Sequence, residues 1–117
     1  MFIKSAIKRG DKSMAVIWSE SAQNDLKLYI ENSKIYTRSK LNEYIDSLIN
    51  YANTLDSSPE LGKIFIKYNN VTIRQLLYGM HRIFYFVDND DIIIIQIAHT
   101  KRNIQNVLRI MKKYFNY

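Results

Sequence analysis

The sequence predicts a single α+β domain built on an antiparallel β-sheet, and three observations support this fold class. The chain has 117 residues, of which 47% are hydrophobic, which is enough for one core and too little for two. Apolar residues recur at helical spacing from residue 20 to residue 55. From residue 63 onward, short runs of β-branched and aromatic residues alternate with turn residues. The predicted order is one strand, two helices, about four strands and a last helix.

The first three elements form a strand followed by a helical hairpin. Residues 15–18 alternate as a strand does, and residues 20–32 have one apolar face and can be capped by Ser19 or Ser21. A second amphipathic helix follows a short link, with Thr37 as its cap. It runs to about residue 55 and ends before a Ser-Ser-Pro sequence, because proline cannot continue a helix. The short link predicts that the two helices are antiparallel.

Four strands are predicted after the hairpin, and short turns join them. They cover residues 63–67, 71–78, 81–87 and 92–98. Asn69-Asn70, Gly79 and a polar loop separate consecutive strands, which implies an antiparallel meander. The last strand has β-branched residues at nearly every position, so we expect it to be central and covered on both faces.

A C-terminal helix is expected to begin near Asn103. Its apolar face consists of Ile104, Val107, Leu108, Met111 and Phe115. Basic residues on the helix give a second pattern, because Arg102, Arg109 and Lys113 are spaced to form one stripe, with Lys112 beside it. The stripe suits a phosphate backbone or an acidic protein face. It is equally explained by the helix dipole, which favours cations near the helix C-terminus.

The net charge of +6 is unevenly distributed along the chain. Residues 14–60 carry four basic and seven acidic side chains, a net charge of −3, whereas residues 61–117 carry nine basic and three acidic ones, a net charge of +6. A basic C-terminal half favours an anionic partner, with nucleic acid as the first candidate and an acidic protein as the second. A solvated basic surface without a partner is the alternative.

Several classes of protein are disfavoured by composition. The chain has no cysteine and two histidines, so we expect no disulfide, no metal site and no cofactor, and the reducing cytoplasm is the expected compartment. The longest apolar run, Ile92–Ile95, is far shorter than the roughly 18 residues of a membrane span.

Residues 1–13 resemble an N-terminal basic extension to a domain that covers residues 14–117. They carry four basic side chains and one acidic side chain, and they lack the apolar core of a secretory signal. Either Met14 is the true start, or the segment is an arm, ordered or disordered.

The strand arginines and the residues that follow the last strand are the candidate functional residues. Alternation places Arg82 on the side of Phe84 and Phe86, and Arg74 on the side of Leu76 and Tyr78. It places His99 on the side of both Ile95 and Ile97. A guanidinium among large apolar residues needs a partner. We therefore expect Arg74, Arg82 and Arg102 to form one cationic cluster at the rim of the sheet, or to pair within the fold.

Five short motifs resemble those of the RelE/ParE superfamily of bacterial type II toxins, over about residues 14 to 110. In chain order they are Trp18-Ser-x-x-Ala22-x-x-Asp25-Leu26, Ser58-Pro-Glu-Leu-Gly62-Lys63, Ile73-Arg74, His81-Arg82-Ile83-Phe84-Tyr85 and Ile97-Ala-His99-x-Lys-Arg102. The resemblance implies a small sheet with a helical hairpin on one face and a concave basic surface on the other. It also implies a cognate antitoxin that wraps the toxin and neutralises it in a hetero-oligomer.

The superfamily contains two mechanisms, and the chain is more similar to the ParE branch. RelE-like members cleave mRNA on the ribosome, whereas ParE-like members inhibit DNA gyrase. Arg82 and the pair Lys101-Arg102 match basic residues of RelE, but Ile73 and Gln75 lie where RelE has lysines, and Leu108 lies where it has a tyrosine. The long helical hairpin and the ending from His99 to Arg102 resemble ParE.

Three functions therefore follow from the resemblance: a ParE-like gyrase inhibitor that arrests growth and stabilises plasmids, a RelE-like ribosome-dependent mRNA endonuclease, and an inactive relative that only binds antitoxin. As a nuclease, the chain would use Arg82, His99 and Arg102 for catalysis, with His81 as a further candidate for proton transfer. The residues expected to bind nucleic acid or another target are Arg74, Arg82, Lys101, Arg102, Arg109 and Lys113.

Overall fold

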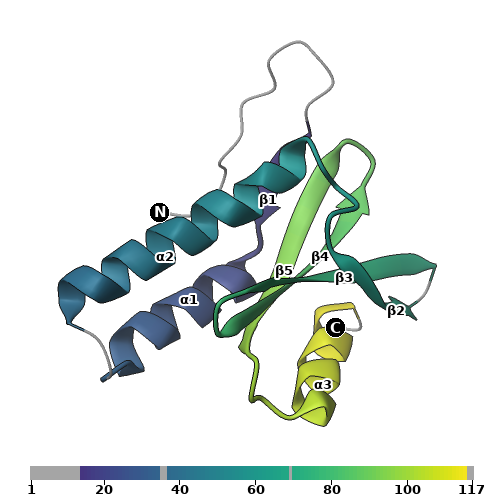
Figure 1. Cartoon of the computed structure of the whole chain (residues 1–117). Coiled ribbons are helices and arrows are strands. Elements are labelled where there is room, and N and C mark those ends of the chain that lie inside the picture. Colours follow the sequence, from purple (N-terminus) through teal and green to yellow (C-terminus); the bar gives the residue numbers. More distant parts are fainter. Residues whose placement is uncertain (1–13, 35–36, 69, 116–117) are drawn as a thin grey trace.

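The structure is a computed structural model, and it describes residues 14–34, 37–68 and 70–115. The predicted extension over residues 1–13 lies outside the described residues. The elements are β1 (Ala15–Trp18), α1 (Glu20–Asn32), α2 (Arg38–Asn53), a short 3₁₀ helix η1 (Thr54–Asp56), β2 (Lys63–Tyr68), β3 (Val71–Tyr78), β4 (His81–Asp88), β5 (Asp91–His99) and α3 (Ile104–Phe115). The predicted α+β class and element order are confirmed (Figure 1).

The two hairpin helices begin at predicted caps. The Ser19 hydroxyl accepts a hydrogen bond from the backbone N–H of Ala22 at 3.0 Å, and the Thr37 hydroxyl accepts one from Lys40 at 3.2 Å. These bonds satisfy donors that a helix start leaves unpaired. The α-helical part of α2 ends at Asn53, before the predicted end, because the chain tightens into the 3₁₀ turn of η1.

The five strands form one sheet in the order β1-β5-β4-β3-β2. Strands β2 to β5 form the predicted antiparallel meander. Strand β1 differs, because it pairs with β5 in parallel, which is possible because the helical hairpin and three strands separate them in sequence. Strand β5 therefore has a neighbour on each side, as its apolar sequence predicted.

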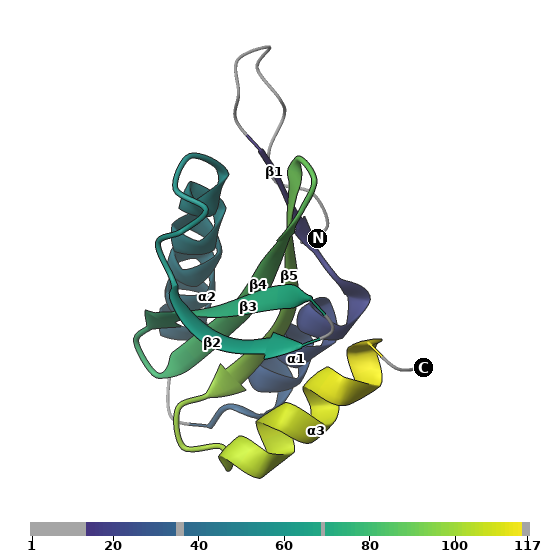
Figure 2. The ribbon, with the colours of Figure 1, turned by 90° about the vertical axis from the view of Figure 1, so that its right-hand side faces the viewer.

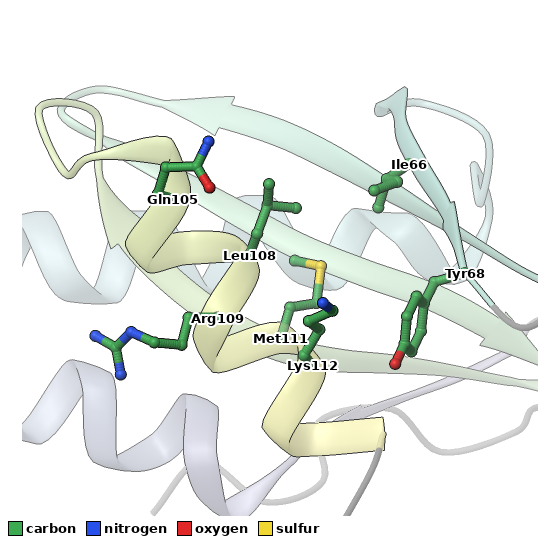
Figure 3. Close-up of a pocket in the computed structure, with 7 residues that line it drawn as sticks. All are labelled: Ile66, Tyr68, Gln105, Leu108, Arg109, Met111 and Lys112. Atoms are coloured by element: carbon green, nitrogen blue, oxygen red, sulfur yellow. The ribbon is translucent and has the colours of Figure 1, made fainter.

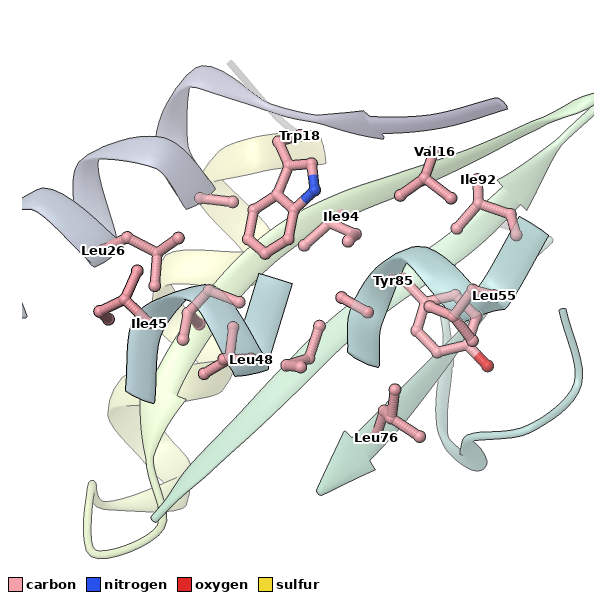
Figure 4. Close-up of a cluster of buried hydrophobic side chains, with 14 of the residues drawn as sticks. Val16, Trp18, Leu26, Ile45, Leu48, Leu55, Leu76, Tyr85, Ile92 and Ile94 are labelled. Atoms are coloured by element: carbon pink, nitrogen blue, oxygen red, sulfur yellow. The ribbon is translucent and has the colours of Figure 1, made fainter. Parts of the chain in front are cut away.

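The larger core lies between the sheet and the α1–α2 hairpin. Figure 4 shows Trp18 from β1, Leu26 from α1, Leu48 from α2 and Tyr85 from β4 in this layer. Each of these side chains is at most 1% exposed. The hairpin is thus fixed to the sheet by side chains from both of its helices.

A second core lies on the opposite face, under α3. Val107 and Met111 of α3 pack with Phe84 of β4 and with Ile95 and Ala98 of β5. Figure 2 shows α3 crossing the sheet on the side away from α2. Helices therefore pack on both faces of the sheet. None of the described helices is long and apolar enough to cross a membrane.

An irregularity in β5 changes which residues share a face. The pairing of β4 with β5 shifts between Phe84 and Tyr85, so that one more residue is accommodated on β5. Ile95 consequently faces α3, whereas Ile97 faces the hairpin. The prediction that Ile95, Ile97 and His99 share one side was wrong, because strict alternation does not hold across a bulge.

Candidate functional site

Arg82 lies on the α3 face of the sheet, near the tight turn that joins β3 to β4. It pairs with Leu77 of β3 and with Ala98 of β5. It lies on the same side of the sheet as Phe84, as alternation along the strand predicted. Around it is a hollow of about 510 Å³. The hollow is lined by Tyr51, Leu61, Gly62, Lys63, Gln75, Leu76, Leu77, Arg82 and Thr100. We call this lining the Arg82 surface, and its two charged members, Lys63 and Arg82, are both cations.

Arg74 lies on the other face and has a structural contact. It pairs with Tyr85, whose ring is in the hairpin core. Its guanidinium donates a hydrogen bond to the carbonyl of Gly62 at 2.8 Å. The Tyr85 hydroxyl accepts from the Gly62 N–H at 2.9 Å and donates to the Pro59 carbonyl at 2.8 Å. Arg74 and Tyr85 together hold the loop before β2, and the predicted cluster that joined Arg74 to Arg82 is wrong.

His81 is buried on the hairpin side in an aromatic cluster. Its Nδ1 is 2.7 Å from the Tyr44 hydroxyl, and its ring is edge-on to those of Tyr29 and His99 at 4.4 and 5.5 Å. Burial, together with the nearby charges of His99 and Arg102, lowers the pKa of His81 from 6.5 to about 4. His81 is therefore neutral at pH 7 and has a packing role.

His99 is paired with His81 at the end of β5 and also belongs to the hairpin side. Its Nδ1 accepts a hydrogen bond from the backbone N–H of Lys101 at 3.0 Å, and its carbonyl accepts one from Arg102 at 2.9 Å. These bonds shape the turn between β5 and α3. The structure therefore does not bring His99 together with Arg82, although both were candidates for one nuclease site.

Asp25 of α1 is a half-buried acid with a structural role that the sequence motifs did not indicate. Its carboxylate accepts a hydrogen bond from the backbone N–H of Ile97 at 2.8 Å, beyond the last pair that β1 makes with β5 at Ile94. Burial raises the pKa of Asp25 from 3.8 to about 6, against the opposing effects of the Ile97 hydrogen bond and the Arg102 charge. The signal available in the sequence was an acid on the inner face of an amphipathic helix.

The basic residues near the C-terminus divide into two groups. Arg102 precedes α3, so it is not part of the predicted helical stripe. Its charge instead acts on the hairpin side, where it opposes the rise in the pKa of Asp25 and adds to the fall in the pKa of His81. Lys101 is exposed in the same turn. Arg109 and Lys113 are exposed on α3, and Arg109 donates a hydrogen bond to the Asn106 side chain at 3.1 Å.

A groove of about 400 Å³ lies between α3 and the edge strand β2. Figure 3 shows Leu108 and Met111 pointing from α3 toward Ile66 and Tyr68, with Lys112 beside Tyr68 and Arg109 directed away from β2. The groove is apolar with a cationic rim.

Among the described residues, no group of three histidine, aspartate or glutamate side chains could hold a metal ion.

Comparison with known proteins identifies a family and solved structures of related fold. Residues 16–104 match the family described as the ParE toxin of the type II toxin–antitoxin system parDE. A chain in the crystal structure of the toxin–antitoxin complex RelBE2 from Mycobacterium tuberculosis is similar in fold, with a TM-score of 0.54 and 18% sequence identity over 74% of this chain and 98% of that chain. No protein of curated function matches the sequence.

Proposed function

Since the chain belongs to the ParE toxin family of type II toxin–antitoxin systems, we propose that it arrests growth by binding and inhibiting DNA gyrase in the cytoplasm. The family match confirms the resemblance that the five sequence motifs indicated. A cognate antitoxin is the proposed partner, in keeping with the toxin–antitoxin complex that contains the related fold.

The separation of Arg82 from the two histidines supports binding rather than RNA cleavage. Attack by a ribose hydroxyl on the adjacent phosphate, without a metal, needs a base, a proton donor and cations around one phosphate. The Arg82 surface offers the cations Lys63 and Arg82 and the uncharged polar side chains of Gln75 and Thr100. The two histidines, His81 and His99, are on the opposite side of the sheet. With its pKa lowered to about 4, His81 is a weak base and is not the protonated acid that a leaving oxygen needs. The Nδ1 of His99 already accepts a hydrogen bond from the Lys101 N–H.

The Arg82 surface is the proposed contact with gyrase. Lys63 and Arg82 flank the exposed side chains of Leu61 and Leu77, which are 47% and 63% exposed. A surface that combines exposed leucines with cations suits a protein partner that offers apolar and acidic side chains. Arg109, Lys112 and Lys113 extend the positive charge along α3.

The proposal is tested with purified toxin and DNA gyrase in a plasmid supercoiling assay. We expect the wild type to inhibit supercoiling and Arg82→Glu to weaken the inhibition by about tenfold or more, because a carboxylate would then face an acidic partner. Lys27→Glu is the matched control, since Lys27 is an exposed cation on α1, in the hairpin. It should inhibit as the wild type does.

The two alternative functions give different results in the same comparison. Cleavage of mRNA in a translating extract, lost in Arg82→Ala, with no effect on gyrase would replace the proposal by a RelE-like nuclease. Absence of both activities, together with normal growth on induction, would identify an inactive relative that only binds antitoxin.

A further inference from the structure

The segment that enters β2 supplies two members of the Arg82 surface. Leu61, which is 47% exposed, comes from the loop after η1, and Lys63 begins β2 opposite Gln75 of β3. Both line the hollow around Arg82. Arg82 belongs to the interior strand β4, whereas Leu61 and Lys63 lie at the start of the edge strand β2. The spacing between them therefore depends on what holds this segment in place.

Gly62 lies between these two residues and is held from the hairpin side of the sheet. Its N–H donates a hydrogen bond to the Tyr85 hydroxyl at 2.9 Å, and its carbonyl accepts one from the Arg74 guanidinium at 2.8 Å. The Tyr85 hydroxyl also donates to the Pro59 carbonyl at 2.8 Å. Side chains of β3 and β4 thus satisfy both backbone groups of Gly62. We call Gly62, Arg74 and Tyr85 the Gly62 clamp.

The close packing of Gly62 shows that the clamp is rigid. A Cβ at this position would lie 2.8 Å from the Tyr85 ring and 2.7 Å from the Gln75 carbonyl oxygen, whereas atoms in contact are about 3.5 to 4.0 Å apart. The Tyr85 ring is fully buried in the hairpin core. Because that core is close-packed, the ring has no room to move aside.

We propose that the Gly62 clamp positions Leu61 and Lys63 for binding to gyrase, although Arg74 and Tyr85 are on the other face of the sheet. This inference rests on the proposed function and deepens it. It makes Arg74 a positioning residue in place of the target-binding residue that the sequence predicted. The physical reason is preorganisation, because a partner that binds side chains on a released loop must first order them, and this lowers the affinity.

The first test compares Tyr85→Phe with a core control in the plasmid supercoiling assay. We expect Tyr85→Phe to raise the toxin concentration needed for half-inhibition by at least about fivefold, since Leu61 and Lys63 would have to be ordered on binding. Ile45→Val is the control: Ile45 is a buried residue of the same core, on α2, and it does not line the hollow. It should inhibit as the wild type does. Thermal unfolding should show that both variants are folded at the assay temperature.

The second test distinguishes positioning from a general loss of stability. In a toxin that already carries Leu61→Ala and Lys63→Ala, adding Tyr85→Phe should change the half-inhibition concentration by less than about twofold. The side chains that the clamp positions are then absent, so the effects are not additive. A fivefold loss in both backgrounds, or normal inhibition by Tyr85→Phe alone, would overturn the proposal.

Amide hydrogen exchange reports on the clamp itself, in the full-length toxin without any partner. The Gly62 amide should exchange slowly in the wild type and in Ile45→Val, and rapidly in Tyr85→Phe. If it stayed protected in Tyr85→Phe while inhibition was lost, the loop would not have been released and the proposal would be wrong.

Growth arrest on induction separates this inference from the proposed function. If the wild type arrests growth without inhibiting gyrase, and the variants keep the expected order in growth arrest, the target is refuted and the positioning role is upheld. Gyrase inhibition by the wild type with equal losses in both backgrounds refutes the positioning role alone. Absence of both gyrase inhibition and growth arrest refutes both.

Discussion

Asp25 and His81 should give the folded protein two opposing pH dependences, and the variant Asp25→Asn should separate them. Both side chains are in the layer between the sheet and the hairpin helices, and both have pKa values that burial displaces toward the neutral form. The displacement is upward for the acid and downward for the base. Their contributions to the free energy of unfolding therefore change in opposite directions as the pH rises.

For Asp25, the folded protein holds a proton more tightly than the unfolded chain. With a pKa of about 6 in place of 3.8, the contribution of Asp25 to stability is fully present below pH 3.8 and is lost as the pH rises through 6. The pKa difference of about 2 corresponds to about 3 kcal/mol, at 1.36 kcal/mol for each pKa unit.

For His81, the folded protein releases a proton more readily. With a pKa of about 4 in place of 6.5, the contribution of His81 is fully present above pH 6.5 and is lost as the pH falls through 4. It also amounts to about 3 kcal/mol. In the wild type the two effects largely cancel between pH 4 and pH 6.

Asp25→Asn keeps an oxygen that can accept the Ile97 hydrogen bond but removes the titration. We expect the free energy of unfolding of this variant, minus that of the wild type, to increase by about 2 to 3 kcal/mol from pH 4 to pH 7. Urea denaturation at each pH measures the difference, and titrations shared by both proteins cancel. A difference that stays constant with pH would show that burial does not displace the Asp25 pKa, and would refute the reasoning.

Two further substitutions test contacts in the core. Gln96→Leu should raise the free energy of unfolding by about 1 to 2 kcal/mol, because neither amide atom of this buried side chain has a hydrogen-bond partner among the described residues. A variant that unfolds at a lower urea concentration than the wild type would mean that the amide is hydrogen-bonded. Tyr85→Phe should lower the free energy of unfolding by about 1 to 3 kcal/mol, since the hydroxyl makes hydrogen bonds with both Gly62 and Pro59. Tyr51→Phe is the control, because the Tyr51 ring is half-buried, and it should change the free energy of unfolding by less than about 0.5 kcal/mol. Equal effects of the two tyrosine substitutions would contradict the assigned role of Tyr85.

The elements were predictable because each has a local signal. Ser19 and Thr37 mark the helix starts with side chains that accept the first free N–H groups. Gly79 and Asn70, with φ values of +54° and +68°, mark turns with a backbone conformation that few residues adopt. The caps and turns depend on residues close in sequence, so one chain is enough to find them. The parallel pairing of β1 with β5 depends on distant residues, and no local pattern indicates it.

The composition of the site was less predictable, because a face is set by the register between strands and not by alternation within one. In a hairpin with a two-residue loop, paired residues have numbers that sum to the same odd value, as Leu77 with Arg82 and Arg74 with Tyr85 do. Residues on one face of the two strands must then differ in parity. Arg74 and Arg82 are both even, so recognising the tight turn at Gly79 would already have separated them. The bulge in β5 is different, since β-branched residues occupy both sides of it, and only packing against α3 decides that Ile95 turns toward that helix while His99 stays on the hairpin side.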